Sequence, residues 1–190
     1  MSKTKNKEAV FLSRKIIAKT RPQKLPVAPT IVSITTITPS SKPKFIPNTR
    51  ILVADDEQLN QKLIKAFITA YQGKEAPEIT IDTAENGQIA IDMFRAGHNK
   101  DAPYHLILMD IMMSTMGGIE AAKKIREIEL SMGISHTPII AATANHHLEK
   151  ELMETTMDGF IGKPFMQKPL IAKIKGVSPN LFDDHDPVIN

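Results

Sequence analysis

Four consecutive apolar residues, Leu106–Met109, end on a carboxylate, Asp110, and are followed by a segment rich in methionine and glycine. A short apolar run with polar and glycine-rich flanks predicts a strand that is buried on both faces, as in a parallel sheet. Asp110 then lies where the strand leaves the sheet. Ligands of open α/β sheets bind at the carboxyl ends of the strands. This run therefore predicts both a fold class and the place of a site.

Three other apolar stretches lead into polar side chains in the same way. They are Ile51–Ala54 before Asp55 and Asp56, Pro138–Ala142 before Thr143, and Phe160–Gly162 before Lys163. The carboxyl ends of parallel strands meet at one edge of a sheet. We therefore expect three carboxylates, a hydroxyl and an ammonium to converge there.

Helical and strand patterns alternate around these stretches. The predicted helices are residues 56–71, Ile89–Ala96, Gly118–Leu130, Leu148–Met157 and Leu170–Lys175. One more strand, the second along the chain, is predicted at Glu78–Ala84 and at the edge of the sheet. Five strand–helix units over residues 50–176 predict a doubly wound parallel sheet with helices on both faces. Gly176 is expected to end the last helix, and residues 177–190 to form a disordered acidic tail.

Size and composition limit the remaining possibilities. A chain of 190 residues with 42% hydrophobic content holds one ordinary domain plus a tail. The absence of cysteine excludes disulfides and thiolate metal sites. No apolar run reaches the roughly 18 residues that indicate a transmembrane helix, and Ala9–Leu12 is too short for a signal peptide. We expect a cytoplasmic protein without membrane insertion.

Residues 1–49 differ from the rest of the chain in charge. They carry ten basic residues and one acidic residue, a net charge of +9, whereas residues 50–190 carry a net charge of −6. A short helix at Glu8–Lys19 or an edge strand at Val27–Thr38 is conceivable, but the prolines favour a largely disordered linker. The positive charge could attract nucleic acid, an anionic membrane or the acidic surface of residues 50–190. Without interleaved aromatic residues or a DNA-reading motif, the sequence does not favour that partner.

The converging groups suggest a chemistry. Three neighbouring carboxylates repel one another, and Mg²⁺ relieves this because it accepts a few carboxylates and keeps several waters. An ammonium at Lys163 can pair with a bound oxyanion, and the Thr143 hydroxyl can hydrogen-bond it. This set describes phosphoryl transfer onto Asp110. Asp–Asp pairs are by themselves more often solvated charges, so the prediction depends on the whole combination.

Five stretches together form a specific pattern. They are Ile51–Glu57, Ala84–Gly87, Leu108–Met113 with Met116 and Gly118, Ala142–Ala144, and Gly159–Phe165. At these residues the chain resembles the receiver domain of two-component response regulators, and in particular the receivers of hybrid kinases and phosphorelays. The resemblance spans residues 50–176 and implies a flavodoxin-like fold with strand order 2-1-3-4-5.

The resemblance also implies roles for individual residues. Asp110 would accept a phosphoryl group from a phosphohistidine, with Thr143 and Lys163 assisting the transfer. The Mg²⁺ ligands would be Asp55 through water, Asp56, Asp110 and the backbone carbonyl of Met112. The phosphate ligands would be Thr143, Ala144 and Lys163. Asn60 and Gln61 flank the site in the family and would face the incoming donor.

Switching is a further implication of the resemblance. Thr143 would move toward the phosphate and Phe160 would turn inward, which changes the surface of the fourth helix, fifth strand and fifth helix. Phe160 can equally be an ordinary core residue. The implied partners are a histidine kinase or a histidine phosphotransfer protein, and a downstream effector. The protein would catalyse only its own phosphorylation and dephosphorylation.

Two other functions are open to the same residues. A receiver-like scaffold could bind a partner without phosphorylation. A free-standing Mg²⁺ phosphohydrolase is disfavoured, because the sequence offers no cap domain or substrate pocket.

Three positions depart from the family pattern. Ser114 replaces the usual proline and Gly117 the usual acidic residue, so the loop after Asp110 is predicted to be more mobile. Thr156 replaces a glycine that commonly ends the fourth helix. A β-branched residue adopts the left-handed conformation only at a cost, so we expect a different cap there.

Overall fold

The computed structural model describes residues 48–72, 79–144 and 156–182, which all belong to one compact unit of the chain. The segments predicted at Glu8–Lys19 and Val27–Thr38 lie outside these residues. Of the predicted helix Leu148–Met157, only Thr156 and Met157 are described, and neither is helical. Among the described helices, none has the length and apolar composition needed to cross a bilayer.

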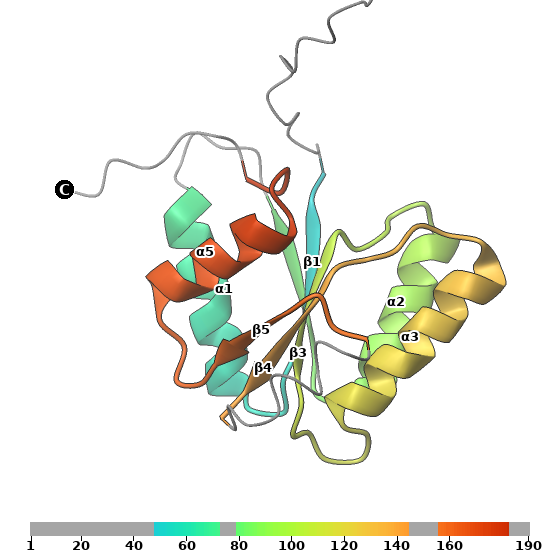
Figure 1. Ribbon diagram of the computed structural model, residues 1–190, viewed down its shortest axis with the longest axis horizontal. Coiled ribbons are helices and arrows are strands. Elements are labelled where there is room, and N and C mark those ends of the chain that lie inside the picture. Colours follow the sequence, from blue (N-terminus) through green and yellow to red (C-terminus); the bar gives the residue numbers. More distant parts are fainter. Residues whose placement is uncertain (1–47, 73–78, 145–155, 183–190) are drawn as a thin grey trace, which may run out of the picture. The chain divides into compact units, whose positions relative to one another are not determined.

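Five parallel strands form one sheet in the order β2-β1-β3-β4-β5, which confirms the predicted flavodoxin-like fold. The strands are β1 Arg50–Ala54, β2 Thr80–Ala84, β3 Leu106–Asp110, β4 Ile139–Thr143 and β5 Gly159–Gly162. The described helices are α1 Gln58–Gln72, α2 Gly87–Asn99, α3 Gly118–Met132 and α5 Gln167–Val177. Figure 1 shows α1 and α5 on one face of the sheet and α2 and α3 on the other.

The apolar run of β3 supplies both cores, because successive side chains of a strand point to opposite faces. Leu106 and Leu108 belong to the core beneath α1 and α5, whereas Ile107 and Met109 belong to the core beneath α2 and α3. All four are at most 2% exposed. Full burial of one such side chain stabilises a fold by roughly 1.5–3 kcal/mol. This double burial fixes the central strand, and with it the place of Asp110.

Helices α1 and α2 begin at other residues than the sequence periodicity predicted, and in both a side chain binds a backbone N–H near the start. Helix α1 starts at Gln58 rather than at residue 56, because the Asp55 carboxylate accepts the Glu57 N–H at 2.9 Å and holds that turn outside the helix. Helix α2 starts at Gly87 rather than Ile89. Its N-cap is Asn86, whose side chain accepts the Ile89 N–H.

The last helix is longer than predicted at both ends. Helix α5 begins at Gln167 instead of Leu170, because Pro169 falls in the first turn, where a missing N–H breaks no helical hydrogen bond. Gly176 lies inside the helix and does not end it, since α5 runs to Val177 and its C-cap is Ser178.

The packed structure extends past the predicted end of the domain. Leu181 and Phe182 are 1% and 5% exposed and join the core beneath α1 and α5. The Phe182 ring meets Tyr71 edge-on, with centroids 5.0 Å apart. The prediction of a disordered tail from residue 177 is therefore wrong for residues 177–182, because two large apolar side chains fill a gap in the core. Residues 183–190 lie outside the described residues.

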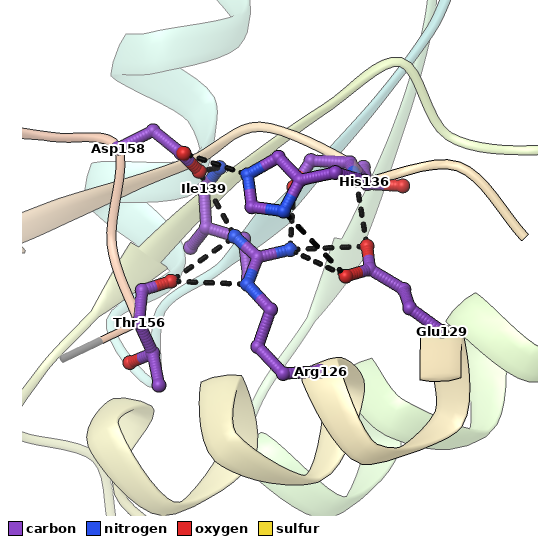
Figure 2. Close-up of polar contacts among 7 residues, drawn as sticks. Arg126, Glu129, His136, Ile139, Thr156 and Asp158 are labelled. Carbon is purple, nitrogen blue, oxygen red and sulfur yellow. Dashed lines mark hydrogen bonds and ion pairs between the residues drawn. The ribbon is translucent and has the colours of Figure 1, made fainter. Parts of the chain in front are cut away.

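A polar network joins α3 to the amino ends of β4 and β5 (Figure 2). The Arg126 guanidinium donates to the Glu129 and Asp158 carboxylates and to the backbone carbonyls of Thr137 and Thr156. The change of helix cap predicted at Thr156 concerns a helix that lies outside the described residues, and it stays a prediction. The Thr156 carbonyl is bound by Arg126.

Candidate functional site

Three aspartates meet at the carboxyl edge of the sheet. Asp55 and Asp56 follow β1, and Asp110 ends the neighbouring strand β3. Each offers a carboxylate oxygen, and the three oxygens lie within 4.8 Å of one another. Asp55 and Asp110 are buried, at 1% and 4% exposure, whereas Asp56 is exposed. Three hard oxygen donors at this spacing fit the ligand preference of Mg²⁺.

Lys163 enters the same site from the loop that follows β5. Its Nζ lies 2.6 Å from Asp110 Oδ2 and 2.9 Å from Asp55 Oδ2. The backbone N–H of Lys163 donates to the carbonyl of Thr143 at 2.9 Å, which continues the pairing of β4 with β5. This pairing sets the height of the lysine above the sheet edge. The ammonium is thereby aimed at the two buried carboxylates.

The two ionisable partners, Asp110 and Lys163, respond to burial differently. Burial raises the pKa of Asp110, and the hydrogen bonds from Lys163 and from the Met112 N–H lower it by less. Burial would lower the pKa of Lys163, but hydrogen bonds to Asp110 and Asp55 outweigh this and hold it above its ordinary value. Among the described residues, three carboxylates lie beside one ammonium, which contacts only Asp110 and Asp55. The site therefore retains an excess of negative charge that favours a cation.

The first turn of α1 fixes the Asp55 carboxylate. Asn60 Nδ2 lies 3.0 and 3.1 Å from the two Asp55 oxygens and 3.1 Å from a carboxylate oxygen of Glu57. Gln61 is buried, and its Nε2 donates to the backbone carbonyl of Asp55 at 2.6 Å. The sequence placed Asn60 and Gln61 beside the site but did not assign them these contacts. An amide at the start of a helix, just after a carboxylate pair, is the signal that could have found them.

The loop between β3 and α3 folds back over the aspartates. The backbone N–H of Met112 donates to Asp110 Oδ1 at 3.1 Å, and the Met112 side chain is 74% exposed. The backbone N–H of Ser114 donates to Asp56 Oδ2 at 3.1 Å. A proline at position 114, as in the family pattern, could not make this bond.

Thr143 and Phe160 lie in β4 and β5, and Ala144 directly follows β4. Thr143 ends β4 and is buried, one residue beyond the partner of Asp110 in the neighbouring strand, and Ala144 follows it at the exposed edge. Phe160 lies opposite Ala141 and packs, half-buried, against the core beneath α2 and α3. The movement predicted for Thr143 and Phe160 stays a prediction.

The comparison with protein families decides what kind of domain carries this site. Residues 51–175 match the family model of the response regulator receiver domain. The chain belongs to this family. The match therefore covers the described sheet except for Arg50, together with every aspartate of the site, and the resemblance inferred from the sequence is confirmed.

Known proteins similar to this receiver domain come from several lineages. Hybrid signal transduction histidine kinase I of Dictyostelium discoideum is 41% identical over 134 residues, which are 69% of this chain and 7% of that protein. The receiver domain of Ssk1 from Saccharomyces cerevisiae was solved together with the histidine phosphotransfer protein Ypd1. Its similarity to this chain has a TM-score of 0.60 at 26% sequence identity, and the match covers 75% of this chain and 98% of the Ssk1 chain. Response regulator TrrA of Thermotoga maritima, solved with Mg²⁺ and BeF, has a TM-score of 0.56 at 32% sequence identity. That match covers 68% of this chain and 98% of the TrrA chain. The likeness to the kinase concerns a small part of its length.

Proposed function

We propose that this receiver domain is the phosphoacceptor of a phosphorelay, with Asp110 taking the phosphoryl group from a phosphohistidine. The observation that carries the proposal is the convergence of four side chains at one sheet edge. Asp55, Asp56 and Asp110 offer carboxylate oxygens within 4.8 Å of one another, and the Lys163 ammonium contacts Asp110 and Asp55. These are an oxygen nucleophile, two further carboxylates and one cation, the parts that a Mg²⁺-assisted phosphoryl transfer requires.

Each residue has a role in the proposed transfer. An Asp110 carboxylate oxygen forms the new O–P bond while the bond from phosphorus to the donor histidine breaks and the imidazole leaves. Lys163 exchanges its contact with Asp110 Oδ2 for a phosphoryl oxygen, and the Thr143 hydroxyl and the Ala144 N–H bind the others. Bound Mg²⁺ would neutralise the negative charge of the transferring group. Its ligands would be Asp55 through water, Asp56, Asp110 and the Met112 carbonyl.

Switching and partners follow from the same proposal. Thr143 moving toward the phosphate would leave space for Phe160 to turn inward, and the surface around β5 and α5 would change for an effector. The donor would be a histidine kinase or a histidine phosphotransfer protein, which the Ypd1 complex of the Ssk1 receiver supports. We expect this exchange in the cytoplasm. The domain would catalyse only its own phosphorylation and dephosphorylation.

Intact-protein mass measurement after incubation with acetyl phosphate and Mg²⁺ tests the proposal. The wild type should gain one phosphoryl adduct, and Asp110→Asn or a chelator should abolish it. Asp92→Asn is the matched control, because Asp92 lies exposed on α2 away from the site and should leave the adduct unchanged. No wild-type adduct at any time point, including the shortest, would instead favour a scaffold that binds partners without phosphorylation.

A further inference from the structure

The exposed Asp56 carboxylate is held differently from the two buried ones. Asp55 is bound by three protein groups, namely the Glu57 N–H, the Asn60 amide and the Lys163 ammonium. Within the part of the chain that the structure describes, Asp56 accepts a hydrogen bond only from the backbone N–H of Ser114. The orientation of Asp56 thus depends on a residue 58 positions away, in the loop before α3.

This loop offers the Ser114 N–H from a position that is fixed on both sides. Met113 and Met116 are each 9% exposed and pack into the core beneath α2 and α3. The Met116 carbonyl accepts the Gly87 N–H at 3.0 Å, which attaches the loop to the start of α2. Between these anchors Thr115 adopts a φ of 69° and reverses the chain. Between Met113 and Met116, both Ser114 and Thr115 are exposed.

We propose that the Ser114 backbone N–H is a positioning group that orients Asp56 for the divalent cation. The inference rests on the proposed function. The hydrogen bond engages Asp56 Oδ2 and leaves Oδ1 available for the cation. Fixing an exposed carboxylate before it binds lowers the entropic cost of ordering it, and a hydrogen bond to a carboxylate is stronger than one between neutral groups. The serine hydroxyl has no part in this role.

Two substitutions at position 114 separate the N–H from the side chain. Ser114→Pro removes the N–H, and the family pattern has proline at this position, so the fold should accept it. Ser114→Ala keeps the N–H and removes only the hydroxyl. Isothermal titration with Mg²⁺ alone, without a phosphodonor, should show affinity weakened about two- to tenfold for Ser114→Pro, which is the scale of ordering one side chain. Ser114→Ala should match the wild type.

Phosphorylation by acetyl phosphate supplies a second readout. The rate for Ser114→Pro should fall at subsaturating Mg²⁺ and recover at saturating Mg²⁺, because positioning affects occupancy of the site and not the transfer itself. A general distortion would lower the rate at both concentrations and would refute the inference. In an Asp56→Asn background, Ser114→Pro should cause no further loss of Mg²⁺ affinity.

The remaining outcomes are also decisive. Equal Mg²⁺ affinity of Ser114→Pro and the wild type would overturn the inference and leave the proposed function intact. Equal weakening by Ser114→Ala would overturn it too, because the side chain would then be responsible. Absence of Mg²⁺ binding by the wild type would overturn the proposed function as well. If Ser114→Pro fails to fold, a main-chain ester at position 114 removes the same N–H without the proline ring.

Discussion

The two edges of the sheet use the same kinds of charged residue in opposite ways. Among the described residues, three carboxylates at the carboxyl edge lie beside one ammonium, that of Lys163, which contacts Asp110 and Asp55. At the amino edge the carboxylates of Glu129 and Asp158 meet the Arg126 guanidinium, and His136 Nε2 lies 2.6 Å from Asp158. Backbone N–H groups of Thr137 and Ile139 donate to the same two carboxylates. The described residues thus provide one cationic group for three carboxylates at the carboxyl edge, and a guanidinium and an imidazole for two carboxylates at the amino edge.

This difference separates a reactive site from a structural one. A satisfied polar network stabilises the native arrangement, and each missing partner leaves a desolvated group unpaired. A cluster in which carboxylates outnumber cations instead reduces stability and is maintained where binding or chemistry requires it. The raised pKa of Asp110, caused chiefly by burial, is the sign of that destabilisation at the carboxyl edge. The contrast predicts opposite responses when charges are removed.

The largest expected effect is at the amino edge. Arg126→Met should lower the free energy of unfolding by about 3–5 kcal/mol, because Glu129, only 5% exposed, would lose its main cationic partner. Equilibrium unfolding in urea measures the change. Lys124→Met is the control on the same helix, where an exposed pair with Glu120 should contribute no more than about 1 kcal/mol. A loss below about 1 kcal/mol for Arg126→Met would remove the proposed contrast between the edges.

Removing charge at the carboxyl edge should have the opposite sign. Asp110→Asn should raise the free energy of unfolding by about 1 kcal/mol at neutral pH without Mg²⁺. A pKa raised in the folded state means that the contribution of Asp110 to stability is full below its ordinary value of 3.8 and is lost as the pH rises through the folded pKa. The gain from the substitution should therefore shrink on acidification.

Thermal unfolding of Asp110→Asn and wild type in chelator, followed from acidic to neutral pH, measures this effect. Asp158→Asn is the matched comparison at the amino edge and should lose stability, because Asp158 accepts from Arg126 and from the Ile139 N–H. If both substitutions changed stability with the same sign, the assignment of one edge as reactive and the other as structural would fail.

The smallest expected effect sharpens the comparison within the amino edge. His136→Asn should cost less than about 1 kcal/mol, since the His136 side chain is 56% exposed and its contact with Asp158 is partly solvated. Equilibrium unfolding in urea measures the loss. A loss as large as that of Arg126→Met would mean that the imidazole, rather than the guanidinium, holds the network together.

The sequence by itself determined the sheet and the main members of the site. The apolar runs of β1, β3 and β4 are hydrophobic enough to predict their own burial, and they are buried in the structure. Parallel strands place their carboxyl ends at one edge of the sheet. The meeting of Asp55, Asp56, Asp110 and Lys163 follows from that geometry, and the structure brings them together as expected. Their metal and phosphate roles remain proposals.

Only the tertiary structure decided how these groups are held. The Ser114–Asp56 bond and the Arg126 network join residues far apart in sequence, through angles and distances that no local pattern encodes. The acidic and proline residues around Leu181 and Phe182 favoured a tail, whereas the two side chains are buried in the core beneath α1 and α5. Local periodicity reports which face of an element is buried. Which polar groups find partners is settled by packing between elements, because hydrogen bonds depend on short distances and restricted angles.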